Sequence, residues 1–180
     1  TTMRMRYIPI LALGCLAILF ASCKKKEVSQ DIIIKKVVKK AAPTTRKMSE
    51  SSWKKVMEWG GESYTVDIHR VADTDLPIVQ DEQQNKYYDN RITLKITRAD
   101  GSIFLDHTFV KADFANLVDD KYGKNGALLG LAFDCIENNN LRFGASVGSP
   151  DAMSDEFIPI TVTVTRSGEI KSERDTQLDA

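Results

Sequence analysis

The sequence predicts an all-β domain, an antiparallel β-sandwich or barrel of about seven to nine strands with one short helix. Segments in which apolar and polar residues alternate recur about every ten residues. Short turn sequences rich in glycine and asparagine separate these segments, and nothing between them demands the long crossover of a parallel sheet. Alternation leaves sandwich and barrel open as alternatives, because strands in both alternate between inside and outside.

The first predicted hairpin joins strands at 55–59 and 62–71 through Gly60-Gly61. Both glycines accept a positive φ at no steric cost, as a two-residue hairpin turn requires. A short apolar segment at 76–79 and a polar loop at 81–90 are expected to follow.

The clearest hairpin is predicted around Asp100-Gly101, between strands at 91–98 and 102–110. After it, apolar residues at helical spacing predict the short helix at 111–118, and a segment rich in glycine and acidic residues, 119–126, predicts a loop. Two more hairpins are expected, with strands 128–137 and 141–147 around Asn138-Asn139-Asn140, then a polar loop at 148–156, then strands 157–166 and 169–174 around Ser167-Gly168.

The N-terminal residues have the order of a secretory signal: a basic flank, an apolar run at 7–20 and two small residues. The run is too short to span a membrane, which takes about 20 apolar residues. The stretch Phe20-Ala21-Ser22-Cys23 resembles the lipobox of bacterial lipoproteins. That resemblance implies cleavage before Cys23, a diacylglycerol on its thiol and fatty acids such as palmitate. We therefore expect a signal peptide at 1–22, a lipidated Cys23 with a basic tether at 23–52, and a β-rich domain at 53–180.

Charge is distributed unevenly along the chain. Residues 24–56 contain 11 basic and 3 acidic residues, whereas residues 57–180 contain 12 basic and 22 acidic residues. A basic tether beside an acylated cysteine suits anionic lipid headgroups, and an acidic domain is a poor partner for nucleic acid. Within the tether, an apolar face and a lysine-bearing face at 33–42 leave two alternatives open, a helix on the membrane surface or a flexible linker.

The sequence contains few candidates for catalytic or metal-ligating residues. His69 and His107 are expected in strands, His69 solvated beside Asp67 and His107 half-buried, with no serine or cysteine nucleophile motif to use them. Cys135 is expected in the core. Cysteines and histidines at the paired spacing of a zinc site are missing. We therefore predict no catalytic residues, no metal site and no cofactor. Acidic loop clusters are expected to be solvated, although calcium could in principle draw them together: Asp73/Asp75, Asp119/Asp120 and Asp151/Asp155/Glu156.

Three aromatic residues are weak candidates for ligand binding. Tyr87 and Tyr88 lie in a polar loop, and Trp59 precedes a turn nearby in strand order, so together they could form an aromatic platform for a sugar or peptide. Alternation would bury one of the two tyrosines, which weakens this prediction.

Several motifs together resemble an uncharacterised family of Bacteroidales lipoproteins with a domain of unknown function. They are Met57-Glu58-Trp59-Gly60-Gly61, Ser63-Tyr64-Thr65-Val66, Lys86-Tyr87-Tyr88-Asp89-Asn90-Arg91, Thr97-Arg98-Ala99-Asp100-Gly101-Ser102 and Glu173-Arg174-Asp175-Thr176. The resemblance covers about 53–179 and implies an exported lipoprotein of a Gram-negative envelope. It implies no activity and no catalytic residues.

These observations favour a non-catalytic binding or accessory module of the cell envelope, whose partner would be an envelope protein or a glycan. A small hydrolase acting on glycan and a structural partner in an envelope complex are the alternatives. Because position 24 is Lys and not Asp, resemblance to lipoprotein sorting rules implies the outer membrane, facing the periplasm.

Overall fold

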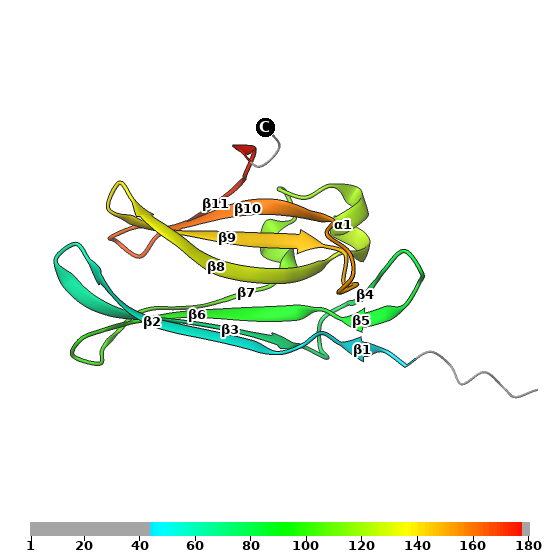
Figure 1. Ribbon diagram of the computed structural model, residues 1–180, viewed down its shortest axis with the longest axis horizontal. Coiled ribbons are helices and arrows are strands. Elements are labelled where there is room, and N and C mark those ends of the chain that lie inside the picture. Colours follow the sequence, from blue (N-terminus) through cyan, green and yellow to red (C-terminus); the bar gives the residue numbers. More distant parts are fainter. Residues whose placement is uncertain (1–43, 178–180) are drawn as a thin grey trace, which may run out of the picture. The chain divides into compact units, whose positions relative to one another are not determined.

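The computed structural model describes residues 44–177, which form two four-stranded antiparallel sheets packed face to face (Figure 1). The first has the strand order β2-β3-β6-β7 and the second the order β8-β9-β10-β11. Their bounds are β2 Ser51–Trp59, β3 Glu62–Ala72, β6 Asn90–Arg98, β7 Ile103–Phe109, β8 Ala127–Glu137, β9 Asn140–Gly148, β10 Phe157–Val164 and β11 Ile170–Arg174. The all-β prediction is confirmed, and the architecture is a sandwich.

One hydrophobic core lies between the two sheets. Alternate residues of β3 and β6 face it from one side, and alternate residues of β9 and β10 face it from the other, as the period of two requires. The completely buried members include Ile92, Leu94, Phe143, Val147 and Val162. The fold is therefore held by apolar side chains of the predicted strands.

The third sheet is small and has the order β1-β5-β4. Its strands are β1 Arg46–Lys47, β4 Ile78–Gln80 and β5 Lys86–Tyr88, and β1 pairs with β5 in parallel. These short strands raise the total to 11 from the expected seven to nine. Two of them lie in segments that the sequence analysis assigned to the tether and to a polar loop, because two or three residues are too few to show alternation. The folded domain thus already includes residues 46–52.

The hairpin turns occur where the sequence predicts them. Gly60 and Gly61 have φ values of 60° and 82°, and Asn138 and Asn139 have φ values of 50° and 61°. Positive φ at both turn residues gives the backbone twist that two antiparallel strands need, and glycine and asparagine adopt it most readily. These turns set the registers of β2 with β3 and of β8 with β9.

The helical segments differ from the prediction. The segment expected to be a helix contains only a 3₁₀ turn, η1 (Lys111–Phe114), whereas the α-helix, α1 (Asp120–Asn125), lies where a loop was expected. The Asp119 side chain accepts a hydrogen bond from the Tyr122 backbone N–H and caps this helix. Tyr122 is then buried against the sandwich. Tertiary packing therefore stabilises a helix in a segment whose glycine and acidic residues predicted a loop.

The predicted signal peptide, Cys23 and most of the tether lie outside the described residues. Within residues 44–177, no helix is long and apolar enough to cross a membrane.

Candidate functional site

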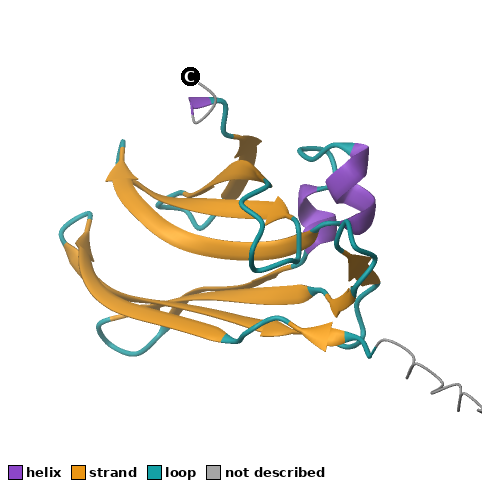
Figure 2. Cartoon of the chain, turned by 45° about the vertical axis from the view of Figure 1, so that its right-hand side comes forward, coloured by secondary structure: helices purple, strands orange, loops and turns teal. Residues whose placement is uncertain are grey.

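Four cavities lie at one end of the sandwich, which we call the helical end, and three of them join segments that are distant in the chain. The helical end is formed by η1 and α1, by the turn between β4 and β5, and by the loop at 149–156 (Figure 2). Regular strands and tight hairpins make up most of the opposite end. Because binding groups are commonly carried by loops on a rigid scaffold, the helical end is the candidate functional site.

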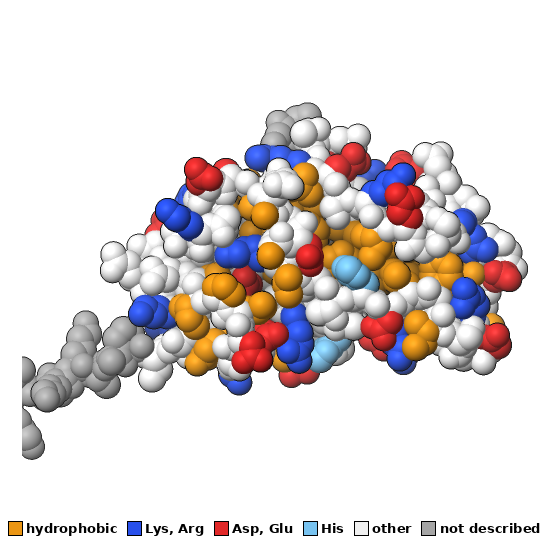
Figure 3. Space-filling view, turned by 180° about the vertical axis from the view of Figure 1, so that it is seen from behind, with side chains coloured by type: hydrophobic (Ala, Val, Ile, Leu, Met, Phe, Trp, Pro, Cys, Tyr) orange, Lys and Arg blue, Asp and Glu red, His pale blue; other side chains and the backbone are white. Residues whose placement is uncertain are grey.

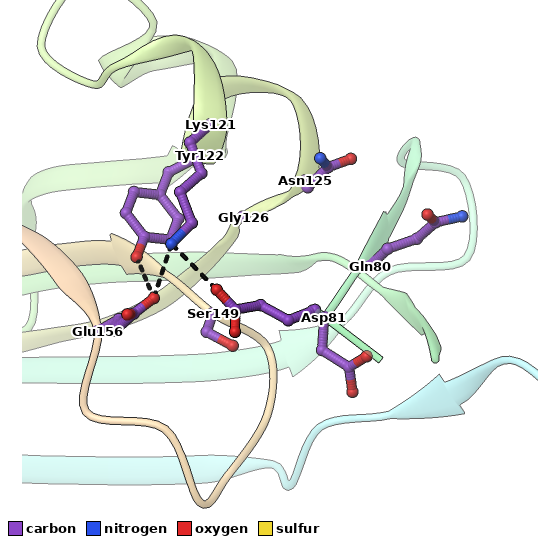
Figure 4. Close-up of a pocket in the computed structure, with 9 residues that line it drawn as sticks. Gln80, Asp81, Lys121, Tyr122, Asn125, Gly126, Ser149 and Glu156 are labelled. Carbon is purple, nitrogen blue, oxygen red and sulfur yellow. Dashed lines mark hydrogen bonds and ion pairs between the residues drawn. The ribbon is translucent and has the colours of Figure 1, made fainter. Parts of the chain in front are cut away.

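The ion-pair pocket is the smallest of the three, at about 80 Å³ (Figure 4). Lys121 Nζ lies 2.8 Å from Glu156 Oε2 and 3.2 Å from Glu82 Oε1, and the Tyr122 hydroxyl donates to Glu156 Oε2 at 2.7 Å. The contacts link α1 to the 149–156 loop and to the turn after β4. This cluster ties the three segments of the helical end together.

Glu156 in the ion-pair pocket does not have the properties of the acid in a glycosidase. Such an enzyme needs one carboxylic acid with a raised pKa that can protonate the leaving group. Hydrogen bonds from Lys121 and then from Tyr122 stabilise the Glu156 carboxylate and lower its pKa. The proton donor that glycoside hydrolysis requires is therefore not supplied by Glu156.

The apolar pocket has a volume of about 340 Å³ and contains a buried acid and a half-buried lysine. Asp89 Oδ1 accepts hydrogen bonds from the backbone N–H groups of Asn90 at 2.7 Å and Leu128 at 2.9 Å. Its Oδ2 lies 3.8 Å from Lys111 Nζ, which donates to the Gly126 carbonyl at 2.7 Å. This pair joins the start of β6 to the start of β8 and to the end of α1.

Burial perturbs both members of the pair. It raises the pKa of Asp89, although the Leu128 and Asn90 N–H groups and Lys111 act in the opposite direction. Burial lowers the pKa of Lys111, against the attraction of Asp89. Perturbed pKa values in a pocket also occur in active sites, but here Asp89 accepts two backbone hydrogen bonds and Lys111 donates one to a backbone carbonyl. The geometry is that of a structural clamp.

The basic pocket is the largest, at about 520 Å³, and lies between β1 and the 149–156 loop. Three cationic side chains line it: Arg46, Lys47 and Arg70. The Arg70 guanidinium donates to the carbonyls of Leu129 and Ser49, and Arg46 donates to the Tyr87 hydroxyl at 3.3 Å. None of the three cations forms an ion pair within residues 44–177, so this pocket is a concentration of positive charge on an acidic domain.

The structure does not bring the predicted aromatic platform together. Trp59 is 1% exposed in the main core beside Tyr64 and Phe104, and its Nε1 donates to the Asn139 carbonyl at 3.0 Å. Tyr87 is 7% exposed and packs in a separate small cluster with Val79 and Ala127, while Tyr88 is half-buried. The expected burial of one of the two tyrosines is observed.

The other predicted residues lie on the sheets, away from the pockets. Both histidines reach the surface (Figure 3): His69 lies 2.6 Å from Glu50 Oε1, and half-buried His107 packs edge-on against Phe109. The expectation that Cys135 is buried is wrong, because a register shift in β8 between Phe133 and Cys135 leaves this thiol half-exposed. Burial first, and then nearby carboxylates, raise the pKa of Cys135.

The acidic clusters are used locally. Asp73 accepts from the Asp75 N–H and pairs with Arg91, Asp119 caps α1, and Asp151 accepts from the Met153 N–H. Within residues 44–177, no group of three or more His, Cys, Asp or Glu side chains is arranged to hold a metal ion.

Comparison with known proteins gives a family for the chain. The model of a domain of unknown function, DUF4738, matches residues 31–171. The chain belongs to this family. Among curated proteins, none matches it. The match starts before the first described strand and ends inside β11, so the sandwich described here is the DUF4738 domain.

The sequence did not indicate the charged residues that line the apolar and basic pockets of the DUF4738 domain. Asp89 stood out only as part of a family motif, Arg70 lay inside the predicted strand at 62–71, and Lys111 was the first residue of the predicted helix at 111–118. Asp89 does carry one local signal in the sequence, because it stands between Tyr87-Tyr88 and the apolar alternation that begins at Ile92.

Gly148 is a position where we expect substitution to disturb the basic pocket. A Cβ atom there would lie 2.6 Å from Phe157 Cα and would also collide with the Glu156 carbonyl, both backbone atoms. Gly148→Ala should therefore displace the 149–156 loop and lower the free energy of unfolding by about 1–3 kcal/mol. Urea unfolding measures this change. Gly144→Ala, on the same strand with open space around it, is the control, and an equal loss in both variants would contradict the prediction.

Proposed function

We propose that this chain is a lipid-anchored protein of a Gram-negative cell envelope that acts, without catalysis, as a binding or accessory module. The lipobox-like Phe20-Ala21-Ser22-Cys23 carries the anchoring part of the proposal. Lysines near the anchored cysteine would add attraction to anionic headgroups. Lys24 supports sorting to the outer membrane, facing the periplasm, and the motifs resembling Bacteroidales lipoproteins point to the same compartment.

One observation supports binding rather than catalysis: the paired charges of the ion-pair pocket and the apolar pocket are already engaged in holding the domain together. Lys121 pairs with Glu82 and Glu156, and Asp89 accepts two backbone hydrogen bonds. A catalytic acid or base has to exchange protons during turnover, and doing so here would break the contacts that join α1 to the sheets. A rigid end with preformed cavities suits ligand or partner recognition.

A structural role in an envelope complex is the second candidate, and exposed apolar side chains favour it. Val56 is 64% exposed, Ile103 53% and Phe157 47%. Figure 3 shows hydrophobic side chains reaching the surface across the middle of one face, with charges of both signs around them. Crosslinking in the native envelope distinguishes the candidates, because a permanent complex gives one dominant crosslinked protein that co-purifies in fixed proportion.

Membrane fractionation tests the anchoring. We expect the wild-type chain in the membrane pellet with an acylated mature N-terminus at Cys23, because two or three acyl chains bind a membrane far more firmly than a single chain. Cys23→Ser should move the protein to the soluble fraction. Cys135→Ser, which removes the half-exposed thiol of β8, should leave it in the pellet. An unchanged pellet for Cys23→Ser, or an unmodified thiol in the mass spectrum of the wild type, would refute the proposal.

A further inference from the structure

The basic pocket contains positive charge that no ion pair within residues 44–177 neutralises. The described residues include 16 basic and 22 acidic residues, a net charge of −6. Against this background the pocket brings together three cations and a single carboxylate, that of Asp151. Charges that gather against the trend of the whole domain create a local field that attracts an ion of opposite sign.

The most buried of these cations is Arg70. Its donors go to two neutral carbonyls, those of Leu129 and Ser49, and its Nε is buried with no hydrogen-bond partner among the described residues. Burial without a carboxylate lowers the pKa of Arg70, although a guanidinium remains charged at neutral pH. An anion bound nearby would offset part of the cost of burying this charge.

The rest of the pocket is suited to a ligand with hydroxyl groups and a flat apolar surface. Three serines, Ser49, Ser149 and Ser154, line it, and so do apolar side chains such as Leu129 and Pro150. Asp151 can accept hydrogen bonds from ligand hydroxyls and repels an anionic group close to it, so a ligand whose anionic group is separate from its hydroxyls fits better than a compact anion such as phosphate. The volume of about 520 Å³ lies in the range of small-molecule sites.

We propose that this pocket binds an acidic sugar, with its carboxylate on Arg46 and Lys47 and its hydroxyls on Asp151 and the serines. The inference rests on the proposed binding role of the domain and names the ligand class for the largest of the cavities described at its helical end. Arg46 and Lys47 are exposed and form no ion pair within residues 44–177, and Arg46 donates only to the neutral Tyr87 hydroxyl, so both can bind a carboxylate. Arg70, which lines the same pocket, adds to the positive electrostatic potential there.

Ligand-observed saturation-transfer NMR of the full chain in detergent tests the proposal. The probes are glucuronate and digalacturonate, with glucose as the neutral sugar and inorganic phosphate as the sugar-free anion. We expect both acidic sugars to bind, glucose and phosphate to bind at least about tenfold more weakly, and Arg46→Gln/Lys47→Gln to weaken the acidic sugars by about tenfold or more. The matched control is Lys54→Gln/Lys55→Gln, which removes the same charge from exposed positions of β2 and should bind as the wild type does.

Several results would overturn the proposal. They are no binding of either acidic sugar by the wild type, binding of glucose or phosphate as tight as that of glucuronate, or an equal loss in the control variant. Circular dichroism spectra of both double variants establish that each remains folded. Because this test does not depend on acylation, its failure is distinguishable from failure of the Cys23 fractionation.

Discussion

Asp89→Ala is expected to lower the free energy of unfolding by about 3–5 kcal/mol, because it removes one partner of a buried charged pair. The backbone N–H groups of Asn90 and Leu128 would lose their acceptor, and Lys111 would lose its counter-charge while remaining half-buried. Thermal unfolding should show a fall of more than about 10 °C in Tm. Asp106→Ala, which truncates an exposed aspartate of β7, should change the stability by less than about 0.5 kcal/mol.

Asp89→Asn separates the hydrogen bonds from the charge. Asparagine keeps an oxygen that can accept from both N–H groups, so this variant should be clearly more stable than Asp89→Ala. Because burial raises the pKa of Asp89 above 3.8, the folded state binds more protons than the unfolded state just above that pH. The contribution of Asp89 to the free energy of unfolding therefore falls as pH rises through the raised pKa.

The comparison of Asp89→Asn with the wild type should consequently change with pH. We expect the variant to gain stability relative to the wild type as pH rises from about 4 towards 7. Urea unfolding at several pH values measures the difference, and the many carboxylates common to both proteins cancel in it. A difference that moves in the opposite direction would mean that Lys111 stabilises the Asp89 carboxylate more than burial destabilises it.

Trp59→Ala is expected to cost about 3–5 kcal/mol of folding free energy, the range for truncating a fully buried large aromatic residue. The indole is 1% exposed and lies 5.1 Å from the Tyr64 ring and 5.2 Å from the Phe104 ring. Arg166 Cζ lies 4.6 Å from the indole on the side where β10 ends. The variant would lose this packing at the end of the sandwich opposite the helical end, where the indole contacts Tyr64 and Phe104 of the first sheet and Arg166 after β10 of the second.

Trp53→Ala is the matched control, because Trp53 is also a tryptophan of β2 but is 38% exposed at the sheet edge. It stacks on Phe133 at 6.1 Å, so its loss should be smaller than that of Trp59 and no more than about 1.5 kcal/mol. Equal losses in the two variants, measured by urea unfolding, would contradict the core position of Trp59.

Most strands of the sandwich could be predicted from the sequence, because the features that indicate them involve residues close together in the chain. Alternation in β3, β6 and β10 and the turn residues Gly60-Gly61 and Asn138-Asn139 predict strands, registers and hairpins from neighbouring residues alone. The sequence did not predict α1, where Asp119 caps a helix that needs the burial of Tyr122 to persist. A helix of six residues is too short to be stable without such packing.

The helical end could not be predicted, because its cavities are made by residues distant in the chain. Arg46 and Arg70 meet the 149–156 loop only when β1 has paired with β5 and the two large sheets have stacked. Tyr87, expected in an exposed platform, is buried by the same pairing. Alternation determines which face of a strand is apolar, but it carries no information about which other strand covers that face.

The sequence by itself determined the β class of the domain, its hairpins and its acidic charge, since periodicity, turn chemistry and composition are properties of the chain read in order. Only the tertiary structure decided that the sheets form a sandwich, that Asp89 is buried beside Lys111, and that one pocket is lined by three cations with no ion pair in the described part of the chain. Burial and electrostatic fields depend on distances between residues far apart in sequence, and these distances exist only once the chain has folded.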